Sequence, residues 1–289
     1  MRWLLLSLLL TSSTSASALY EDLHARVQKL IDASGAEVAV AFETIDGKQS
    51  LSIDSEKPFH AASTMKIPVM IELFRQASAG MLSLDEPLLV KNEFHSIVDG
   101  SLYQLSVGDD SDAEIYKAVG KTMTLRQLCD EMITVSSNFA ANLLIERLGV
   151  KNIQATTDRL GAPGMHVLRG VEDQKAFDKG LNNVTTARAL AALLLKLSEG
   201  QAVNPKADAD MIDILKRQHF HDAIPAGLPD GTVVAHKTGN ITKIHHDAAI
   251  VYGKTPYVLV VLVRGIADEK KSATVIASIS REIWDTIEH

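Results

Sequence analysis

Hydrophobic and polar residues follow two periods along this chain, one typical of strands and one typical of helices. A helical pattern covers about residues 19–31, and two strand-like stretches, 37–45 and 50–53, follow around the turn signal Asp46-Gly47. Apolar residues then recur every three to four positions, which predicts a block of amphipathic helices. This spacing is found in residues 67–74, 125–133, 139–148 and 190–197.

Strand character returns near the end of the chain, and a closing helix is predicted over about residues 270–287. The late strand-like stretches are residues 232–236, 247–252 and 257–265. Strands from both ends of the chain can join one antiparallel sheet only when the helical block is inserted between them.

The order of elements therefore predicts an α/β part and an all-α part. We expect the α/β part to comprise residues 19–62 and 205–289, with an antiparallel sheet flanked by the terminal helices. The inserted all-α part would comprise residues 63–204. A cleft between two such parts is where a binding site is expected.

Residues 91–120 differ from the helical patterns around them. They are polar and acidic and show no sustained period, which predicts a long surface segment at the mouth of the cleft. Tyr103 and Tyr116 in this segment are candidates to stack on a substrate, although tyrosines with no such role are common at protein surfaces.

The first 18 residues have the layout of a secretory signal. Arg2 precedes an apolar run over residues 3–10, and Ala16-Ser17-Ala18 has the form that signal peptidase cleaves. The run is too short to span a bilayer, and no later stretch is long enough. We expect a secreted or periplasmic protein that starts at Leu19 and does not associate with a membrane after signal removal.

Composition narrows the class of partner. A net charge of −7 without a basic tract argues against nucleic acid or an anionic membrane. Cys129 is the only cysteine, so no internal disulfide can form, and its apolar helical surroundings favour burial over reactivity. We expect a monomer, as the default, that acts on a small molecule without a cofactor.

The stretch HAASTMKIPVMIELF, residues 60–74, places Ser63 three positions before Lys66 at a predicted helix start. Residues at this spacing share a helix face, so the two side chains can meet. A serine nucleophile needs a base within hydrogen-bond reach, and a lysine can serve when its surroundings lower its pKa. A capping serine beside a solvated lysine gives the same letters. The pair alone leaves both interpretations open.

Two further motifs favour the catalytic interpretation. Ser136-Ser137-Asn138 lies between two helical patterns, and Lys237-Thr238-Gly239 ends a strand-like stretch. With Ser63-x-x-Lys66 they resemble, in order and context, the signature motifs of class A serine β-lactamases and penicillin-binding proteins. The resemblance covers most of the chain. It departs at Ser137, where the family has an aspartate, and in the 73-residue spacing from Ser63 to Ser136, which indicates an insertion.

The resemblance implies a role for the residues of the first two motifs. Ser63 would attack the lactam carbonyl and become acylated, with Lys66 taking part in its activation. Ser136 would relay a proton to the departing lactam nitrogen. Asn138 would hydrogen-bond the side-chain amide of the substrate and help to hold Lys66.

The third motif is implied to bind the substrate carboxylate through Lys237 and Thr238, with Gly239 completing it. The backbone N–H groups of Ser63 and Asn240 would form the oxyanion hole. A second cation often assists carboxylate binding in this family. The candidates here are His246, on the next predicted strand, and Arg217.

An acyl-serine is released only when a base activates water, and in class A enzymes a loop glutamate does this. Glu172, 36 residues after Ser136, has nearly the family's spacing and is the candidate. The loop around it departs from the family's pattern, since Ala176 stands where an asparagine is usual. Asn182 or Asn183 are then candidates to hold the water. Alternatively, Glu172 is one charge on a solvated loop.

Arg169 precedes Glu172 by three residues and is a candidate to tie the loop down by pairing with Asp173 or Asp178. A zinc site is a further alternative for the region, because histidines lie near the third motif. However, Asp222 follows His221 directly, which breaks the ligand spacing of zinc hydrolases, and we expect no metal site. The histidines concerned are His219, His221, His245 and His246.

The sequence thus predicts a serine β-lactamase that acylates Ser63 and deacylates with Glu172. The main alternative is a D-alanyl-D-alanine peptidase that acts on cell-wall peptides. Such peptidases share the three motifs, and the altered loop around Glu172 leaves this alternative open. A non-catalytic penicillin-recognising or cell-wall-binding module with the same fold is a second alternative.

Overall fold

A five-stranded antiparallel sheet lies at the centre of the computed structural model, which describes residues 11–288 and the side chains from residue 22 onward. The strand order is β2-β1-β11-β10-β9, so strands from both ends of the chain do form one sheet, as predicted. The strands are β1 (Glu37–Thr44), β2 (Ser50–Ile53), β9 (Val233–Ile241), β10 (Ile244–Tyr252) and β11 (Tyr257–Arg264).

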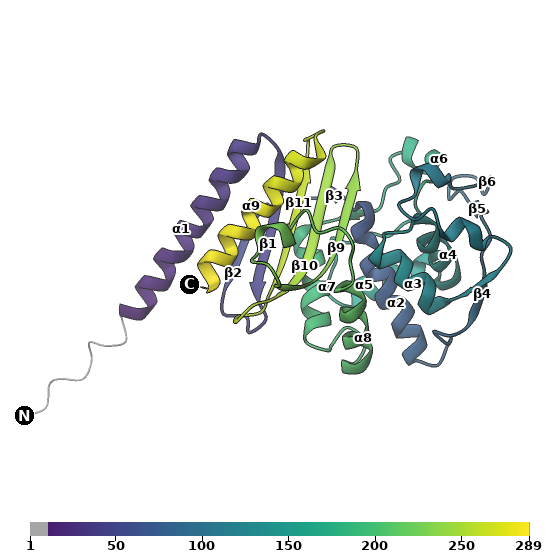
Figure 1. Ribbon diagram of the computed structural model, residues 1–289, viewed down its shortest axis with the longest axis horizontal. Coiled ribbons are helices and arrows are strands. Elements are labelled where there is room, and N and C mark those ends of the chain that lie inside the picture. Colours follow the sequence, from purple (N-terminus) through teal and green to yellow (C-terminus); the bar gives the residue numbers. More distant parts are fainter. Residues whose placement is uncertain (1–10, 289) are drawn as a thin grey trace, which may run out of the picture.

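The terminal helices α1 (Thr11–Ser34) and α9 (Glu269–Glu288) cover one face of this sheet, as expected (Figure 1). Period-two alternation in β1 directs Val38, Val40 and Phe42 toward these helices, while Ala39 and Ala41 face the other side. The apolar stripe of α1 packs against that of α9 in the same core cluster. The sheet therefore separates two apolar cores.

The opposite sheet face packs on α7 (Ala187–Ser198) and is continuous with the core of the helical part. The other helices of this part appear on the right of Figure 1. They are α2 (Lys66–Ser78), α3 (Leu125–Thr134), α4 (Asn138–Leu148), α5 (Val150–Arg159) and α6 (Gln174–Asp178), with α8 (Pro205–Leu215) below the sheet. Because α7 falls within residues 63–204 yet packs on the sheet, the domain boundaries stay a prediction.

Short elements connect these layers. Two-residue strands pair β3 (Phe59–His60) with β8 (Val184–Thr185) and β5 (Phe94–His95) with β6 (Leu102–Tyr103), and β4 (Pro87–Leu89) pairs with β7 (Thr122–Thr124). The 3₁₀ turns are η1 (Ala62–Met65), η2 (Val107–Asp109), η3 (Ile115–Ala118) and η4 (Pro225–Gly227).

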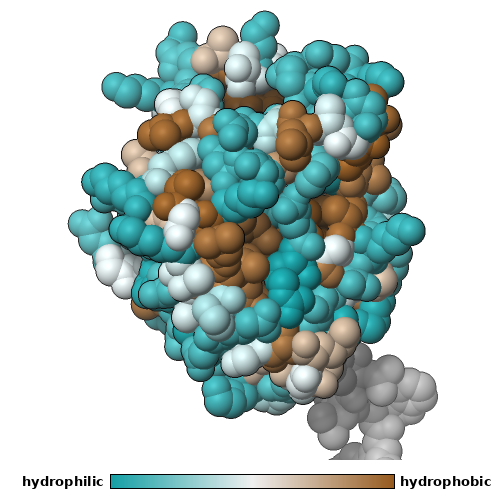
Figure 2. Space-filling view, turned by 90° about the vertical axis from the view of Figure 1, so that its right-hand side faces the viewer, coloured by the Kyte–Doolittle hydropathy of each residue, from teal (hydrophilic) through white to brown (hydrophobic). Residues whose placement is uncertain are grey.

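The segment 91–120 runs along the surface, as predicted, but is anchored by the buried side chains of Phe94, Leu105 and Ile115. Figure 2, which views the helical side of the molecule, shows apolar residues between hydrophilic ones on that face. Leu102 and Val107 are among the exposed apolar residues of this segment.

The predicted secretory signal lies partly outside the described residues, which begin at Thr11, eight positions before the expected mature start at Leu19. The signal therefore stays a prediction. None of the helices in the described range is both long and apolar enough to cross a bilayer. Cys129 is buried and unpaired in α3, as predicted, and burial raises the pKa of its thiol.

Candidate active site

Ser63 lies in η1, one 3₁₀ turn ahead of α2, and Lys66 is the first residue of that helix. The backbone is unusual here, because Ala62 adopts a left-handed φ of 45° that non-glycine residues rarely adopt. The turn also lies close to β9. A Cβ atom added to Gly239 would meet the Ser63 backbone nitrogen at 3.1 Å, so a glycine at this strand position allows the approach.

Lys66 is completely buried, and its ammonium group bonds the segment that joins α3 to α4. Its Nζ donates to the Ser136 carbonyl oxygen at 2.6 Å and to the Asn138 Oδ1 at 2.8 Å, with a longer bond to the Ser136 hydroxyl at 3.3 Å. Within the described part of the chain no hydrogen bond joins it to the Ser63 hydroxyl. Burial lowers the pKa of Lys66 to about 7, against the opposing effects of Asp110 and Glu172.

Ser136 receives hydrogen bonds from two lysines. Lys237, completely buried in β9, donates to the Ser136 Oγ at 3.0 Å and to the Thr238 carbonyl oxygen at 2.9 Å, and Lys66 donates to the same Oγ. Burial, and then the Lys66 charge, lower the pKa of Lys237 well below its usual value. Since its oxygen accepts from both lysines, the Ser136 hydroxyl is free to donate its own proton.

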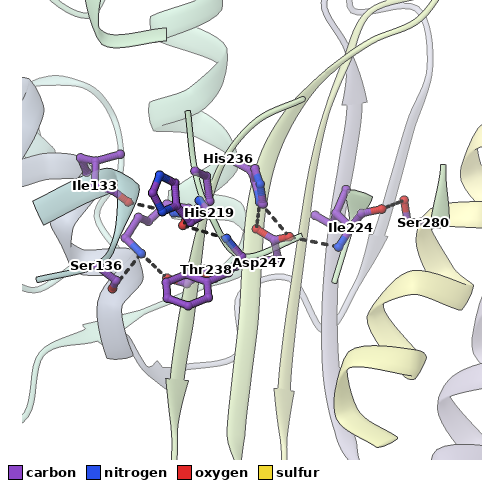
Figure 3. Close-up of polar contacts among 11 residues, drawn as sticks. Ile133, Ser136, His219, Ile224, His236, Thr238, Asp247 and Ser280 are labelled. Carbon is purple, nitrogen blue, oxygen red and sulfur yellow. Dashed lines mark hydrogen bonds and ion pairs between the residues drawn. The ribbon is translucent and has the colours of Figure 1, made fainter. Parts of the chain in front are cut away.

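Figure 3 shows Ser136 and Thr238, the two hydrogen-bond partners of Lys237, together with a second chain of polar contacts that includes His236, Asp247 and Ile224. In that chain the Asp247 carboxylate bonds the His236 Nδ1 at 3.0 Å and accepts from the Ile224 N–H at 3.0 Å. Both side chains are completely buried on the sheet face opposite Lys237. This pair braces the strand that carries the third motif.

Asn138 joins two parts of the site. It begins α4, accepts from Lys66 and donates through Nδ2 to the Glu172 Oε1 at 2.7 Å. Ser137, the departure from the family motif, is the N-cap of α4 and accepts from the Ala140 N–H at 3.2 Å. A single amide side chain thus connects the proposed base of acylation to the proposed base of deacylation.

Asp110 is a site residue that the sequence interpretation missed. Its carboxylate accepts from the backbone N–H groups of Asn138 at 3.0 Å and Phe139 at 2.8 Å, across 28 and 29 residues of chain. It therefore places a negative charge at the N-terminus of α4, where the family carries its aspartate next to the motif serine. The polar segment 91–120 supplies this group.

Glu172 lies on a loop, residues 166–184, that is closed by paired backbone bonds between His166 and Val184. It is half-buried and has a left-handed φ of 61°, a strained conformation for a glutamate. Burial raises the pKa of its carboxyl group, and the nearby Asp110 and Asp109 act in the same direction. The solvated-loop alternative does not describe this environment.

Side chains of α4 hold this loop close to Glu172. Asn142, one helical turn after Asn138, accepts from the Val171 N–H at 2.7 Å and donates to the Val171 carbonyl at 3.0 Å. Gly170 lies so close to α4 that an added Cβ would stand 2.6 Å from the Asn142 Oδ1. The repeat of asparagine at i and i+4 was the one sequence signal for this contact.

The predicted pairing of Arg169 was wrong. Arg169 does not pair with Asp173 or Asp178, because its buried guanidinium donates to the Leu181 and Gly170 carbonyls and to the Asn182 side chain. The Asn182 Oδ1 accepts this bond, and a role of Asn182 or Asn183 in holding the water stays a prediction. The Asn183 amide bonds the backbone of residues 168 and 169.

Tyr103 and Tyr116, the two candidates for stacking on a substrate, are half-buried and are not among the residues that line the hollows at Ser63. The Tyr103 hydroxyl donates to the Val171 carbonyl at 3.2 Å, and the Tyr116 ring packs on Phe139 with centroids 4.8 Å apart. Asp173 adds the main link between this segment and the loop, since it accepts from the Ser96 hydroxyl and the Ile97 N–H, each at 2.9 Å.

Neither candidate for a second cation faces the cleft. His246 is completely buried, bonds the His60 carbonyl at 2.9 Å, and has a pKa that burial lowers to about 4, so it is neutral near pH 7. Arg217 is paired with Asp130 at 2.8 Å. Among the described residues no three His, Cys, Asp or Glu side chains gather as a ligand set for a metal ion.

Two adjoining hollows form one cleft, because both are lined by Ser63, Asn138 and Asn240. The first, about 320 Å³, is completed by Ser136 and Thr238, and the second, about 730 Å³, includes Glu172. Ser63 and Ser136 line this cleft, and the buried Lys66 and Lys237 lie behind them, bonded to the Ser136 hydroxyl; we call these four residues the floor of the cleft. The predicted residues of all three motifs, together with Glu172, therefore gather at one opening.

The sequence matches known proteins over almost its whole length. The model of the beta-lactamase enzyme family matches residues 22–287. The chain is 25% identical to a beta-lactamase of Bacteroides uniformis over 281 residues, 92% of this chain and 91% of that protein. It is 28% identical to beta-lactamase AST-1 of Nocardia asteroides over 285 residues, 96% of this chain and 86% of that protein.

Solved structures of two kinds share the fold. PBP-A superposes with a TM-score of 0.80 at 25% identity, covering 92% of this chain and 96% of that one. An ancestral class A beta-lactamase superposes with a TM-score of 0.79, also at 25% identity, over 92% of this chain and 100% of that one. A point mutant of PBP-A, solved as an acyl-enzyme complex with penicillin G, gives a TM-score of 0.79 at 25% identity, over 93% of this chain and 97% of that one.

Proposed function

Since the chain belongs to the beta-lactamase enzyme family and is a hydrolase acting on β-lactams, we propose that it opens the lactam ring through an acyl-enzyme on Ser63, which water activated by Glu172 then releases. One observation carries the proposal. The Asn138 amide bonds both Lys66 and Glu172, and Ser63 and Glu172 line the same cleft.

In acylation, the Ser63 oxygen bonds to the lactam carbonyl carbon, and the neutral Lys66 amine takes its proton. The pKa of about 7 supports this role, because much of Lys66 is then neutral near physiological pH. The lactam C–N bond breaks, the nitrogen takes a proton from the Ser136 hydroxyl, and Lys66 returns its proton to Ser136 along the bond that joins them.

Backbone and strand groups of the cleft bind the rest of the substrate. The N–H groups of Ser63 and Asn240 are assigned to the oxyanion, which the close approach of η1 to Gly239 supports. The substrate carboxylate is assigned to Lys237 and Thr238. A bound carboxylate would raise the lowered pKa of Lys237 again, so binding and protonation support each other.

In deacylation, Glu172 takes a proton from water, the hydroxide oxygen bonds to the acyl carbon, and the Ser63 oxygen leaves with a proton returned from Glu172. A raised pKa brings this carboxyl closer to the operating pH, as a general base requires, while the Asn138 bond orients it. The left-handed backbone at Glu172 is the kind of strain found at functional positions.

The Glu172→Gln variant tests the deacylation step. Glutamine keeps the acceptor for Asn138 but removes the base, so acylation by benzylpenicillin should persist while kcat falls roughly 10³-fold. Intact-mass spectra should show an accumulating adduct on Ser63. Asp178→Asn is the matched control, an exposed carboxylate on the same loop whose one side-chain hydrogen bond to a described residue comes from Gln174. Normal turnover by Glu172→Gln without an adduct would exclude Glu172 as the base.

A second candidate function is a D-alanyl-D-alanine peptidase, favoured by the likeness to PBP-A and by a loop that departs from the family's pattern. Turnover of a chromogenic cephalosporin separates the two: sustained hydrolysis supports the lactamase, and one burst equal to the enzyme concentration supports the peptidase. Secretion to the periplasm or beyond and a monomeric state complete the proposal for the mature protein.

A further inference from the structure

The charges around the mouth of the cleft are one-sided. Asp109, Asp222 and Glu269 line the hollow that also holds Ser63 and Thr238, and Asp109 and Glu269 line the adjoining hollow as well. They come from η2, from the segment before η4 and from the start of α9, so three distant parts of the chain contribute carboxylates to one opening. All three residues are exposed and carry a negative charge near pH 7.

No neighbouring cation neutralises these carboxylates. In the part of the chain that the structure describes, none of the three side chains forms an ion pair or a hydrogen bond. Lys243 shares a surface hollow with Glu269, and Lys270 shares another with Asp222, but neither lysine lines the cleft at Ser63.

Each cationic side chain at the cleft already has hydrogen-bond partners or an assigned ligand group. Lys66 bonds Ser136 and Asn138, and Lys237 is the one assigned to the substrate carboxylate. Arg169 lines the larger hollow but directs its guanidinium to carbonyls of its own loop. The cleft therefore offers one place for an anionic group, at its floor, and an anionic mouth around it.

From this distribution we infer that the enzyme prefers β-lactams whose side chain carries an amine over those whose side chain carries a second carboxylate. The inference rests on the proposed function and concerns which β-lactams the same cleft accepts. Each carboxylate acts on the side chain of the substrate through several ångströms of solvent, so the effect of a single charge is small. The three charges have the same sign, so their effects add, and the total effect decreases as the salt concentration rises.

Three penicillins with a common nucleus test the inference: ampicillin carries an amine on its side chain, carbenicillin carries a carboxylate, and benzylpenicillin carries neither. The second-order rate constant for acylation of Ser63 is measured for each by stopped flow and intact mass, in the full chain at about 20 mM salt. The ratio of ampicillin to carbenicillin should fall roughly tenfold in the combined Asp109→Asn, Asp222→Asn, Glu269→Gln variant. Benzylpenicillin should change less than threefold.

Asp230→Asn is the matched control, an exposed carboxylate at the far end of β9, and it should leave the ratio unchanged. Raising the salt to about 0.5 M should reduce the wild-type ratio toward that of the triple variant, because exposed charges are then screened. A steric origin of the preference would not respond to salt.

The readout separates this inference from the proposed function. If all three penicillins acylate Ser63 but none turns over, the deacylation proposal fails while the ratio still tests the charge effect. If turnover is normal and the triple variant keeps the wild-type ratio, the charge inference is overturned alone. Absence of acylation by all three penicillins would overturn both.

Discussion

The floor of the cleft and the loop that carries Glu172 are built in different ways. Lys66 on α2 and Lys237 on β9, the edge strand of the central sheet, are completely buried, so the packing of these elements fixes their positions. The 166–184 loop has no long element of its own. Its shape is fixed by hydrogen bonds between side chains and backbone groups, such as those of Asn142 with Val171 and the bond that Asp173 accepts from the Ile97 N–H.

Because of this difference, acylation depends on groups held by core packing, whereas deacylation depends on a group held by hydrogen bonds of a loop. Displacing a core element means disturbing close-packed apolar contacts, which costs several kcal/mol. A loop hydrogen bond contributes only about 1 kcal/mol. The deacylation half of the site can therefore be altered by small changes that leave the acylation half intact.

Backbone strain is shared by both regions. Ser136 at the floor, Ala62 directly before Ser63, and Glu172 on the loop have positive φ angles, and each such residue costs roughly 1–3 kcal/mol. At the floor the surrounding helices hold the strained residues in place. On the loop this depends on Asn138 and Asn142, both on α4.

The largest effect is expected from Lys66→Met, which keeps the buried volume but removes the base of the floor. Acylation by benzylpenicillin should fall roughly 10³-fold, because Ser63 loses its proton acceptor and Ser136 its proton source. Rapid-quench intact mass measures the step directly. The exposed Lys117→Met variant should acylate normally. If Lys66→Met were acylated at the wild-type rate, Lys66 would not be the base that activates Ser63.

The floor could be predicted from the sequence because its residues stand in short motifs on periodic elements. The strands and helices were predicted from alternation, and the long antiparallel pairing followed from their order. The hairpin of β9 and β10 extends beyond the predicted strands: the third motif was expected to end its strand, but β9 runs to Ile241, and β10 begins at Ile244 instead of residue 247. Residues 237–240 lack apolar alternation, and their pairing with β10 overrides this local preference.

The contacts of the loop could not be predicted, because they depend on distances that only the fold creates. Asp110 and Asn142 reach their partners across 28 and 29 residues, and the spacing of Asn138 and Asn142 by one helical turn does not tell which part of the chain they bind. The strand pair β3 and β8, which ties the loop to the segment before Ser63, has only two residues in each strand. The sequence of a polar loop is compatible with many sets of hydrogen bonds, so the partners cannot be assigned before the backbone conformation is known.

Two glycine substitutions compare the regions directly, with the floor variant expected to show the larger effect. Gly239→Ala brings a Cβ to 3.1 Å from the Ser63 nitrogen, so acylation should fall roughly 10²-fold through a displaced oxyanion donor. Gly170→Ala brings a Cβ to 2.6 Å from the Asn142 Oδ1, so deacylation should slow about tenfold while acylation stays unchanged. Single-turnover and steady-state kinetics separate the two rates.

The control for both variants is Gly108→Ala, whose added Cβ would meet only the Ser106 Oγ at an ordinary 3.6 Å. It should change neither rate by more than about twofold. If Gly170→Ala slowed acylation as strongly as deacylation, the loop and the floor would be one mechanical unit, and the comparison between them would be wrong.

The smallest effect concerns Asp110, whose charge acts on both regions at once. It raises the pKa of Lys66 by attraction and the pKa of Glu172 by repulsion. Asp110→Asn should therefore lower both values. Acylation needs neutral Lys66 and deacylation needs ionised Glu172, so both rates rise with pH through these values. The rising limb of the pH profile should then move to lower pH, by roughly half a pH unit.

A merely structural role for Asp110 predicts something else. Asparagine keeps one of the two oxygen acceptors at the N-terminus of α4 but loses the other acceptor and the negative charge. A structural role therefore predicts a lower melting temperature, worth about 1 kcal/mol, and an unchanged pH midpoint. Asp210→Asn, a carboxylate on α8 paired with Lys206, is the control for charge removal far from the cleft. A midpoint that stays in place, or moves to higher pH, would show that the Asp110 charge does not set the proton affinities of the two bases.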